Sequence, residues 1–389
     1  MPTDKTLFIL CSFCVFVGMI ASFSLSAYAI LRYDISQPYH FFVRQCVAGF
    51  LGIFAMWTIS RLNPEKHLVI IGFSIFFACL FAMGFMHYLP EHLVTSAGGA
   101  KRWIRLPGFS FAPVEFFKIG FVFFLAWSFA RKINHEKKPL LQEILLLLPY
   151  FVMFAIFVIY LIAVMQNDIG QVIVLALTFS VMAFFAGTSF RFFSLAILLS
   201  TIVATFAVIN SENRIMRVKI WWSTAQNAIL SFLPDKVANA LRVENTPEPY
   251  QLSHSLNAIK HGGFFGEGIG DGIVKLGYLS DVHTDFVLAG ITEEAGAIGS
   301  IGITAVFCII IYRIFKIASR SQNRVYSLFA LGISMLIVFS FLMNAYGVTS
   351  ITPIKGIAVP FLSYGGSSLL ATCIGVGMVL MISKRADLK

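Results

Sequence analysis

The stretch from Leu68 to Leu89, LVIIGFSIFFACLFAMGFMHYL, runs for 22 residues without Asp, Glu, Lys or Arg. A helix of this length rises about 33 Å, enough to cross the roughly 30 Å hydrocarbon core of a bilayer. The remaining sequence has a similar character, because 58% of the 389 residues are hydrophobic, only 12% are charged and 41 are Phe. Soluble domains carry about twice that share of charge. The composition therefore predicts a membrane protein and excludes a disordered chain, a disulfide scaffold and a two-domain cytosolic enzyme.

Ten stretches of this kind predict an all-α integral membrane protein in which residues 1–389 form a single polytopic domain. The expected transmembrane helices are 7–31, 41–60, 68–89, 112–130, 141–165, 169–188, 192–210, 286–312, 325–347 and 358–382. The six cysteines lie in or beside these spans, and we interpret them as small apolar residues.

The distribution of basic residues predicts the orientation in the membrane. An even number of spans puts both termini on the same side, where the termini and short loops carry fifteen Lys and Arg, against six in the short loops of the other side. Since Lys and Arg accumulate in cytoplasmic loops, both termini are predicted to be cytoplasmic. Residues 211–285, between the seventh and eighth helices, then form a long extracytoplasmic loop. This topology accounts for the net charge of +10 without a nucleic-acid partner.

Charged residues gather near the outer ends of the spans. Lys101 and Arg102 precede the fourth helix, where they form either an interfacial anchor or a site for an anionic head group. Glu115 and Lys118 are three residues apart, so they share a helical face and can pair. Such a pair either locks the helix to a neighbour or lines a cavity. Asp168, in the hairpin between the fifth and sixth helices, is expected to cap the next helix.

Three further acidic residues mark the eighth helix. Asp285 stands at its outer N-terminus, where free N–H groups and the helix dipole stabilise a carboxylate, so a cap is the simplest role. Glu293 and Glu294 follow eight and nine residues later, about 12–13 Å further along the helix. Because adjacent helical residues do not share a face, we expect at least one of them to meet a separate cation or cavity water, with Lys118 as a candidate partner.

Two segments of irregular sequence interrupt the apolar pattern on the outer side. In the long loop, 219–233 and 251–260 are expected to form short interfacial helices. The glycine-rich run 262–270 is either a lid over a substrate or packed irregular structure. Residues 353–368 hold two Pro and three Gly, which predicts broken backbone that lines protein and not lipid. Within that segment Lys355 either snorkels to the interface or binds phosphate.

Several motifs of the chain resemble those of the SEDS polymerases, a family that includes FtsW and RodA. The resemblance is carried by Tyr250-Gln251-Leu252 through Gly270, by His283-Thr284-Asp285-Phe286 with Glu293-Glu294, and by Pro353-x-Lys355-Gly356 with Pro360-Phe361-x-Ser363-Tyr364-Gly365-Gly366-Ser367-Ser368. It covers all ten expected spans and the order of the motifs. The last motif is more similar to the FtsW branch than to the RodA branch. Gly277 departs from the FtsW pattern, which often has an acidic residue there, so a second loop acid is in doubt.

The resemblance implies a peptidoglycan glycosyltransferase that polymerises lipid II into glycan strands during septal cell wall synthesis. Asp285 matches the essential acid of the family, and we interpret it as the general base that takes a proton from the acceptor sugar hydroxyl. The residues predicted to bind substrate are Lys101, Arg102, Lys275, Lys355, Ser363 and Ser367. The residues predicted to be structural or to line a cavity are Glu115, Lys118, Asp168, Glu293 and Glu294.

The same resemblance implies partners and a location. Expected partners are lipid II, a class B penicillin-binding protein transpeptidase and other membrane proteins of the divisome. The expected location is the bacterial inner membrane at the division septum. No metal ligands are assigned, and a divalent cation such as Mg²⁺ or Mn²⁺ is left open.

Other functions remain open at this point. A lipid II flippase, which is a transporter, needs polar groups through the whole membrane thickness, whereas the inner halves of the spans are almost uncharged. A RodA-type elongation polymerase would share the chemistry and differ only in its place in the cell. A secondary solute transporter predicts related halves with paired broken helices, but the Gly and Pro interruptions lie mainly in the C-terminal half.

Overall fold

The computed structural model describes the chain from residue 3 to residue 387 with eleven gaps. The described residues are 3–32, 37, 39–90, 93–97, 100–106, 109–133, 139–209, 212–231, 234–243, 250–279, 281–353 and 356–387. Within them, nine helices are long and apolar enough to cross a membrane, so the helical, multi-pass membrane fold is confirmed.

The membrane helices follow the predicted order along the chain. They are α1 (Lys5–Leu25), α3 (His40–Arg61), α4 (Pro64–Phe85), α5 (Pro113–Lys132), α6 (Leu140–Phe154), α7 (Ile169–Ala186), α12 (Val287–Arg320), α13 (Arg324–Val348) and α14 (Gly366–Ser383). The 3₁₀ turn η1 (Met86–Tyr88) extends α4, and the π-helix η2 (Ala155–Met165) extends α6. The expected seventh span corresponds to α8 (Phe190–Ile209), in which several side chains lie outside the described set. Asp4, Asn63 and Asn323 cap α1, α4 and α13 by accepting a backbone N–H of the first turn.

Two predicted span boundaries are wrong. The first span ends at Leu25, and a separate short helix, α2 (Ala27–Arg32), follows it. The last span begins at Gly366 and not at residue 358, because Phe361 has a positive φ of 65° and the preceding Pro360 lacks an N–H group. The irregular segment 356–365 that results leads into α14.

The expected eighth span, 286–312, is not one straight helix. Gly296 takes φ 67° and ψ −171°, so α12 turns sharply at this residue. Thr292 Oγ1 and Ser300 Oγ are 2.7 Å apart, although eight residues of straight helix would separate them by about 12 Å. The part after the turn, 297–320, continues well beyond the predicted end at residue 312.

The outer segments contain more regular structure than the sequence predicted. The long loop forms α9 (Glu212–Leu230), α10 (Asp235–Leu241), α11 (Tyr250–Gly262) and the 3₁₀ turn η3 (Val274–Leu276), so both predicted interfacial helices exist with shifted ends. An unpredicted antiparallel sheet of order β1-β2-β3 precedes α5. Its strands are β1 (Val94–Ala97), β2 (Ala100–Leu106) and β3 (Phe109–Phe111).

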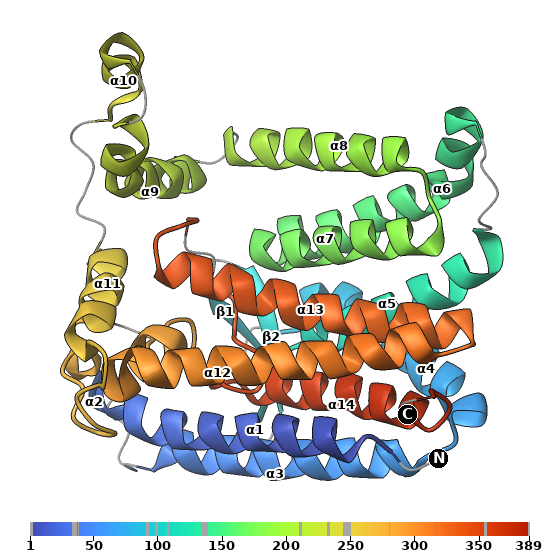
Figure 1. The fold of residues 1–389 in the computed structure, drawn as a ribbon, viewed down its shortest axis with the longest axis horizontal. Coiled ribbons are helices and arrows are strands. Elements are labelled where there is room, and N and C mark those ends of the chain that lie inside the picture. The colour runs from blue at the N-terminus through green and yellow to red at the C-terminus, as the bar shows by residue number, and fades with distance from the viewer. Residues whose placement is uncertain are drawn as a thin grey trace.

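The helices lie side by side as a bundle, with both chain ends at one end of it (Figure 1). Figure 1 also shows α2, α9, α10 and α11 at the opposite end. The buried core centres on α5, α13 and α14. The segments before α12 and α14 are joined by a hydrogen bond, and Ser367 at the start of α14 bonds to β3.

Candidate active site

Asp285 lies where the segment before α12 meets the segment before α14. Ser363 Oγ donates a hydrogen bond of 2.6 Å to the carbonyl of Thr284. The backbone N–H of Tyr364 donates one of 2.8 Å to the carbonyl of His283. These two bonds fix the chain immediately before Asp285. From the sequence, Asp285 was predicted to be a helix cap or the general base.

The backbone and carboxylate of Asp285 are held separately. Asn344 Nδ2, from α13, donates hydrogen bonds of 2.7 Å to the carbonyls of both Asp285 and Ile357. Gly356 lies against the carboxylate with φ 63°, and a Cβ at that position would stand 2.9 Å from Asp285 Oδ2. Asp285 is partly buried, and together with Asn344 and Gly356 it lines a cavity of about 180 Å³.

The surroundings of Asp285 suit a proton acceptor. Burial, followed by the charges of Asp281 and Asp168, raises the pKa of Asp285 from 3.8 to about 6, while Arg102 acts in the opposite direction. Burial lowers the pKa of His283 to about 4, so its ring is neutral at pH 7. At pH 7 Asp285 is therefore mostly ionised, yet its carboxylate is more basic than an ordinary one, which is what general-base catalysis requires.

Arg102 reaches this region from the sheet. Its Nε and Nη2 atoms donate 2.8 Å hydrogen bonds to the carbonyls of Gln166 and Asn167, in the hairpin before α7. The next residue, Asp168, caps α7 by accepting a 3.2 Å bond from the N–H three residues on. Burial raises the pKa of Asp168. The charge of Arg102 lowers the pKa of Asp285 and the charge of Asp168 raises it. The sheet and this hairpin therefore both influence the ionisation of Asp285.

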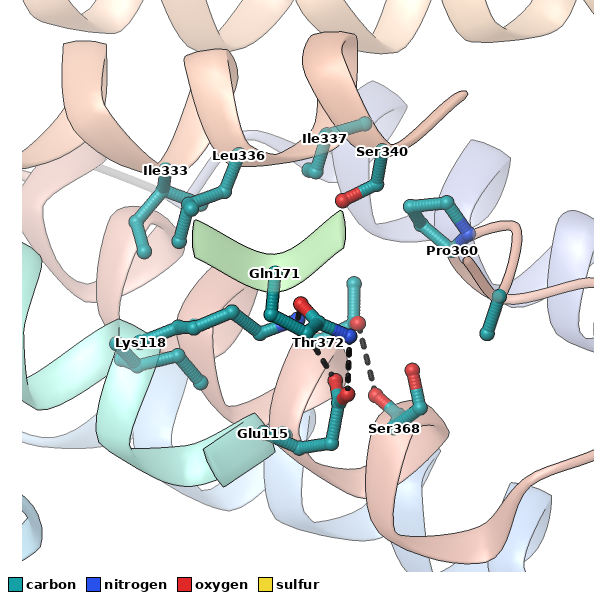
Figure 2. Close-up of a pocket in the computed structure, with 14 residues that line it drawn as sticks. Glu115, Lys118, Gln171, Ile333, Leu336, Ile337, Ser340, Pro360, Ser368 and Thr372 are labelled. Carbon is teal, nitrogen blue, oxygen red and sulfur yellow. Dashed lines mark hydrogen bonds and ion pairs between the residues drawn. The ribbon is translucent and has the colours of Figure 1, made fainter. Parts of the chain in front are cut away.

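A second, larger cavity of about 490 Å³ lies between α5, α7, α13 and α14. Figure 2 shows Glu115, Lys118 and Gln171 on its lower side, facing Ile337 and Ser340 of α13. Lys118 Nζ is 2.9 Å from Glu115 Oε2 and donates to Gln171 Oε1 at 2.8 Å, while Gln171 Nε2 donates to Glu115 Oε1 at 3.1 Å. The two roles left open for the pair, structural and cavity-lining, are thus combined in one closed network.

The structure corrects the partner predicted for the glutamates of α12. Glu294 pairs with Lys275, not with Lys118, and their Oε1 and Nζ atoms are 2.7 Å apart. Lys275 Nζ also donates to Ser24 Oγ at 3.1 Å and to the carbonyl of Gly270. All three of its N–H groups are therefore used inside the protein. In this arrangement Lys275 has none left to bind the phosphate that the sequence analysis assigned to it.

Glu293 is also buried, and it holds the long loop. Its Oε1 accepts hydrogen bonds from the N–H groups of Ile273 and Val274 at 2.9 and 3.0 Å, and from His261 Nδ1 at 3.2 Å. Glu293 and Glu294 thus hold different parts of the loop, as expected for adjacent helical residues that do not share a face. The glycine-rich run is packed against α12.

Three of the other predicted substrate ligands, Lys101, Ser363 and Ser367, form hydrogen bonds to backbone groups in the structure. Lys101 Nζ donates to two backbone carbonyls just after α4, at 3.1 and 3.0 Å. Ser367 Oγ donates to a carbonyl of β3 at 2.8 Å and accepts the N–H before α5 at 3.0 Å, and the Ser363 hydroxyl is likewise used by backbone. Both serines connect segments of the site. Lys355 lies outside the described residues.

No three His, Cys, Asp or Glu side chains converge on a metal-binding position anywhere in the described ranges. The described residues therefore show no ligand set for Mg²⁺ or Mn²⁺, and the need for either ion stays open.

Sequence reasoning missed Asn344 and Gln171. Each is a lone amide in an apolar span, a signal that was present but not used. Amide groups are costly in hydrocarbon, so they mark positions that face polar partners inside the bundle. Here one amide supports Asp285 and the other completes the Glu115–Lys118 network.

The chain is similar to known proteins over nearly its whole length. A family model named for FtsW, RodA and SpoVE and described as "Cell cycle protein" matches residues 4–388. A protein of Helicobacter pylori called "Probable peptidoglycan glycosyltransferase FtsW" is 47% identical over 385 residues, which cover 99% of each chain. A protein of the same name from Geobacter sulfurreducens is 31% identical over 368 residues, 95% of this chain and 91% of the relative.

Solved structures show the same fold. One chain, from a structure described as "Structural coordination of polymerization and crosslinking by a peptidoglycan synthase complex", has a TM-score of 0.69 and 22% identity, with 99% of this chain and 98% of that one covered. The rod shape determining protein RodA of Thermus thermophilus has a TM-score of 0.64 and 20% identity, with 100% and 99% covered.

Proposed function

This chain belongs to the cell cycle protein family of FtsW, RodA and SpoVE and is a peptidoglycan glycosyltransferase of the FtsW branch; from this premise we propose that Asp285 is the general base of the reaction. The observation that carries the proposal is the placement of one carboxylate, with its pKa raised to about 6, at the edge of a cavity where the segments before α12 and α14 meet. The nearby acids have other places, because Asp168 caps α7 and Asp281 is exposed.

The proposed step joins two polyprenyl-linked substrates, a donor and an acceptor, of which at least one is lipid II. The Asp285 carboxylate takes the proton of the acceptor sugar hydroxyl as that oxygen attacks the anomeric carbon of the donor. The bond from this carbon to the pyrophosphate breaks, and the polyprenyl pyrophosphate leaves with the electron pair. One carboxylate is sufficient, because the acceptor hydroxyl replaces the water that a hydrolase would activate.

The leaving pyrophosphate requires positive charge nearby. Arg102 is the supported candidate, because its charge already acts on Asp285 and its guanidinium carries five N–H donors in a fixed plane. Lys355 remains a second candidate, since it follows two residues after Pro353 and directly precedes Gly356, which touches the carboxylate. These cations would stabilise charge that appears only as the bond breaks.

The proposal extends to partners and place. A class B penicillin-binding protein is the expected partner, because the fold matches a chain described within a peptidoglycan synthase complex. Septal synthesis at the bacterial inner membrane, beside other divisome proteins, is favoured over a RodA-type role in elongation because the relatives of at least 30% identity carry the name FtsW.

The decisive substitution is Asp285→Asn. It preserves size but removes the proton acceptor, so we expect glycan synthesis from labelled lipid II to fall at least 100-fold. The assay uses purified chain with and without a class B transpeptidase and resolves the products on a gel. Asp271→Asn is the matched control, because Asp271 is exposed in the long loop and is not among the charges that act on the pKa of Asp285. Wild-type glycan yield from the Asp285 variant would remove it from the role, and lipid II movement across vesicles without glycan would favour the flippase.

A further inference from the structure

Asn344 carries a buried oxygen without a hydrogen-bond partner among the described residues. The residue is only 4% exposed, so Oδ1 has little access to bulk water. Leaving an amide oxygen unpaired in such a place is costly, and the exceptions in folded proteins call for an explanation.

The orientation of this amide is fixed by its neighbours. Both groups that contact Nδ2, the carbonyls of Asp285 and Ile357, can only accept hydrogen bonds. The atom near both carbonyls must therefore be the NH₂ nitrogen. If Nδ2 and Oδ1 were exchanged, Oδ1 would lie against two carbonyl oxygens with no hydrogen between them. It follows that Oδ1 is the atom left without a partner.

The residue that carries the unpaired oxygen, Asn344, lines the same cavity as Asp285. Asn344, Gly356 and the Asp285 carboxylate share this cavity of about 180 Å³. A side chain at residue 356 would fill the space, as its Cβ would lie 2.9 Å from the carboxylate. The cavity thus offers two side-chain oxygens, one ionised and one neutral, and both accept hydrogen bonds.

We infer that Asn344 contacts substrate, and that its Oδ1 accepts a hydrogen bond from a second donor on the acceptor sugar beside the hydroxyl that Asp285 deprotonates. The inference rests on the proposed function. One hydroxyl has only one hydrogen, which goes to Asp285, so Asn344 needs a neighbouring hydroxyl or an amide N–H of the sugar. Two acceptors in fixed positions would select one hydroxyl of the ring for attack.

The test pairs Asn344→Ala with lipid-linked acceptors in which single donors next to the reacting hydroxyl are replaced by hydrogen. With wild-type protein we expect one such acceptor to lose about 10-fold or more in kcat/KM, because Oδ1 stays unpaired. With the variant, the same replacement should cost nothing further. A purely structural role would give equal losses with both proteins and would overturn the inference.

Two further measurements complete the test. The thermal unfolding midpoint checks that Asn344→Ala still folds. Ser327→Ala, near the other end of α13 and in the lining of neither cavity, is the control that should keep the wild-type response to every acceptor. If the variant instead needed more Mg²⁺ or Mn²⁺ and showed no dependence on the sugar donors, a cation would be the partner and the inference would be wrong. Glycan synthesis by Asp285→Asn tests the proposed function separately, because it does not depend on the acceptor analogues.

A different observation concerns the glycine loop, residues 262–270. At the turn of α12, two N–H groups of this loop donate to the carbonyls of Glu293 and Glu294, each at 3.0 Å. The N–H groups of Ala297 and Ile298 donate back to loop carbonyls at 3.0 and 3.3 Å. The loop thus supplies the bonds that the broken helix lacks, which allows irregular backbone to lie at membrane depth.

The depth of the loop follows from an ion pair at the other end of α12. Arg313 Nη2 and Asp4 Oδ2 are 2.6 Å apart, at the end of the bundle that carries the termini. Ile298 precedes Arg313 by fifteen residues, or about 22 Å of helix, which is less than the roughly 30 Å of hydrocarbon. Along α1, Ser24 lies twenty residues after Asp4 and contacts the buried Lys275–Glu294 pair, so that polar cluster is about 30 Å away.

We further propose that the tip of the glycine loop inserts into the outer leaflet and contacts lipid acyl chains. Its apolar side chains are unusually exposed, with Phe264 at 62%, Phe265 at 81% and Ile269 at 70%. They continue the exposed apolar face of α12, where Ile298 and Ile301 are 48% and 64% exposed. That face belongs to a membrane span, so acyl chains are the partner that fits both surfaces.

Cysteine labelling in proteoliposomes tests the insertion. Phe265→Cys is placed in a background in which the partly exposed Cys46 and Cys308 are changed to Ser, since the other four cysteines are buried. A thiol in hydrocarbon does not ionise, so we expect at least a 10-fold slower reaction with a water-soluble maleimide than for Leu241→Cys on α10. Equal rates for both cysteines in denaturant confirm that each is present. Equal rates in the bilayer would overturn the proposal.

Discussion

At the scale of single residues, the site depends on the Asp285 carboxylate, whose ionised form is destabilised by its surroundings. Burial raises the pKa of Asp285 most, and Asp281 adds to it through its negative charge. The folded protein therefore favours the protonated form more than the unfolded chain does. The stability from this effect is complete below pH 3.8 and is lost as the pH rises through about 6. Activity has the opposite dependence, because a base must be ionised.

Asp281→Asn should shift the acidic limb of the pH–activity profile to lower pH. Removing the neighbouring negative charge lowers the pKa of Asp285, so the base stays ionised in more acidic solution. Asp281 has φ 58°, which Asn tolerates, and its backbone carbonyl still accepts from Thr284 and Asp285. The initial rate of glycan synthesis between pH 4.5 and 8 measures the shift. Asp271→Asn is the control and should leave the midpoint in place; an unmoved midpoint in the Asp281 variant would contradict the assignment of this limb to Asp285.

At the scale of elements, helices were predictable from sequence but their interruptions were not. Apolar runs located the spans, because hydrocarbon imposes both length and composition. The turn at Gly296 gave no such signal, since glycine also occurs in straight membrane helices. Its cause is distant in sequence: the glycine loop completes the broken bonds. For the same reason Asp285 could be singled out by its motif, while the support from Asn344 and the use of Lys275 by Glu294 could not.

Gly296→Ala should loosen the glycine loop from α12. A Cβ at residue 296 would lie 2.4–2.6 Å from backbone atoms of the loop, and the φ of 67° with ψ −171° suits glycine alone. We expect a loss of roughly 1–3 kcal/mol from strain, or more from the contact. The midpoint of thermal unfolding in detergent and the rate of proteolysis in residues 262–276 report it. Gly302→Ala on the same helix is the control, because a Cβ there meets nothing within 4 Å. Similar melting of both variants would mean that the turn is not needed.

At the scale of the whole molecule, the two ends of the bundle have different tasks. The end with the termini is closed by contacts between helix ends, where Arg324 donates to the carbonyls of Ile133 and Ala186 at 3.0 and 2.9 Å. The other end holds α2, α9, α10 and α11 (Figure 1). Since glycan strands are expected to be polymerised at the extracytoplasmic face of the membrane, we expect the closed end to face the cytoplasm. The distribution of Lys and Arg predicted this orientation independently.

Reporter fusions test this orientation. A fluorescent protein that folds only in the cytoplasm should be bright when fused after residue 387, because both termini lie at the closed end. Alkaline phosphatase, which is active only outside the cytoplasm, should be active when fused after residue 243, beyond α10. Exchanging the two reporters should abolish both signals, which controls for expression. An active phosphatase at the C-terminus would show that the molecule has the opposite orientation in the membrane. Asp285 would then face the cytoplasm, away from the strand that it is proposed to extend.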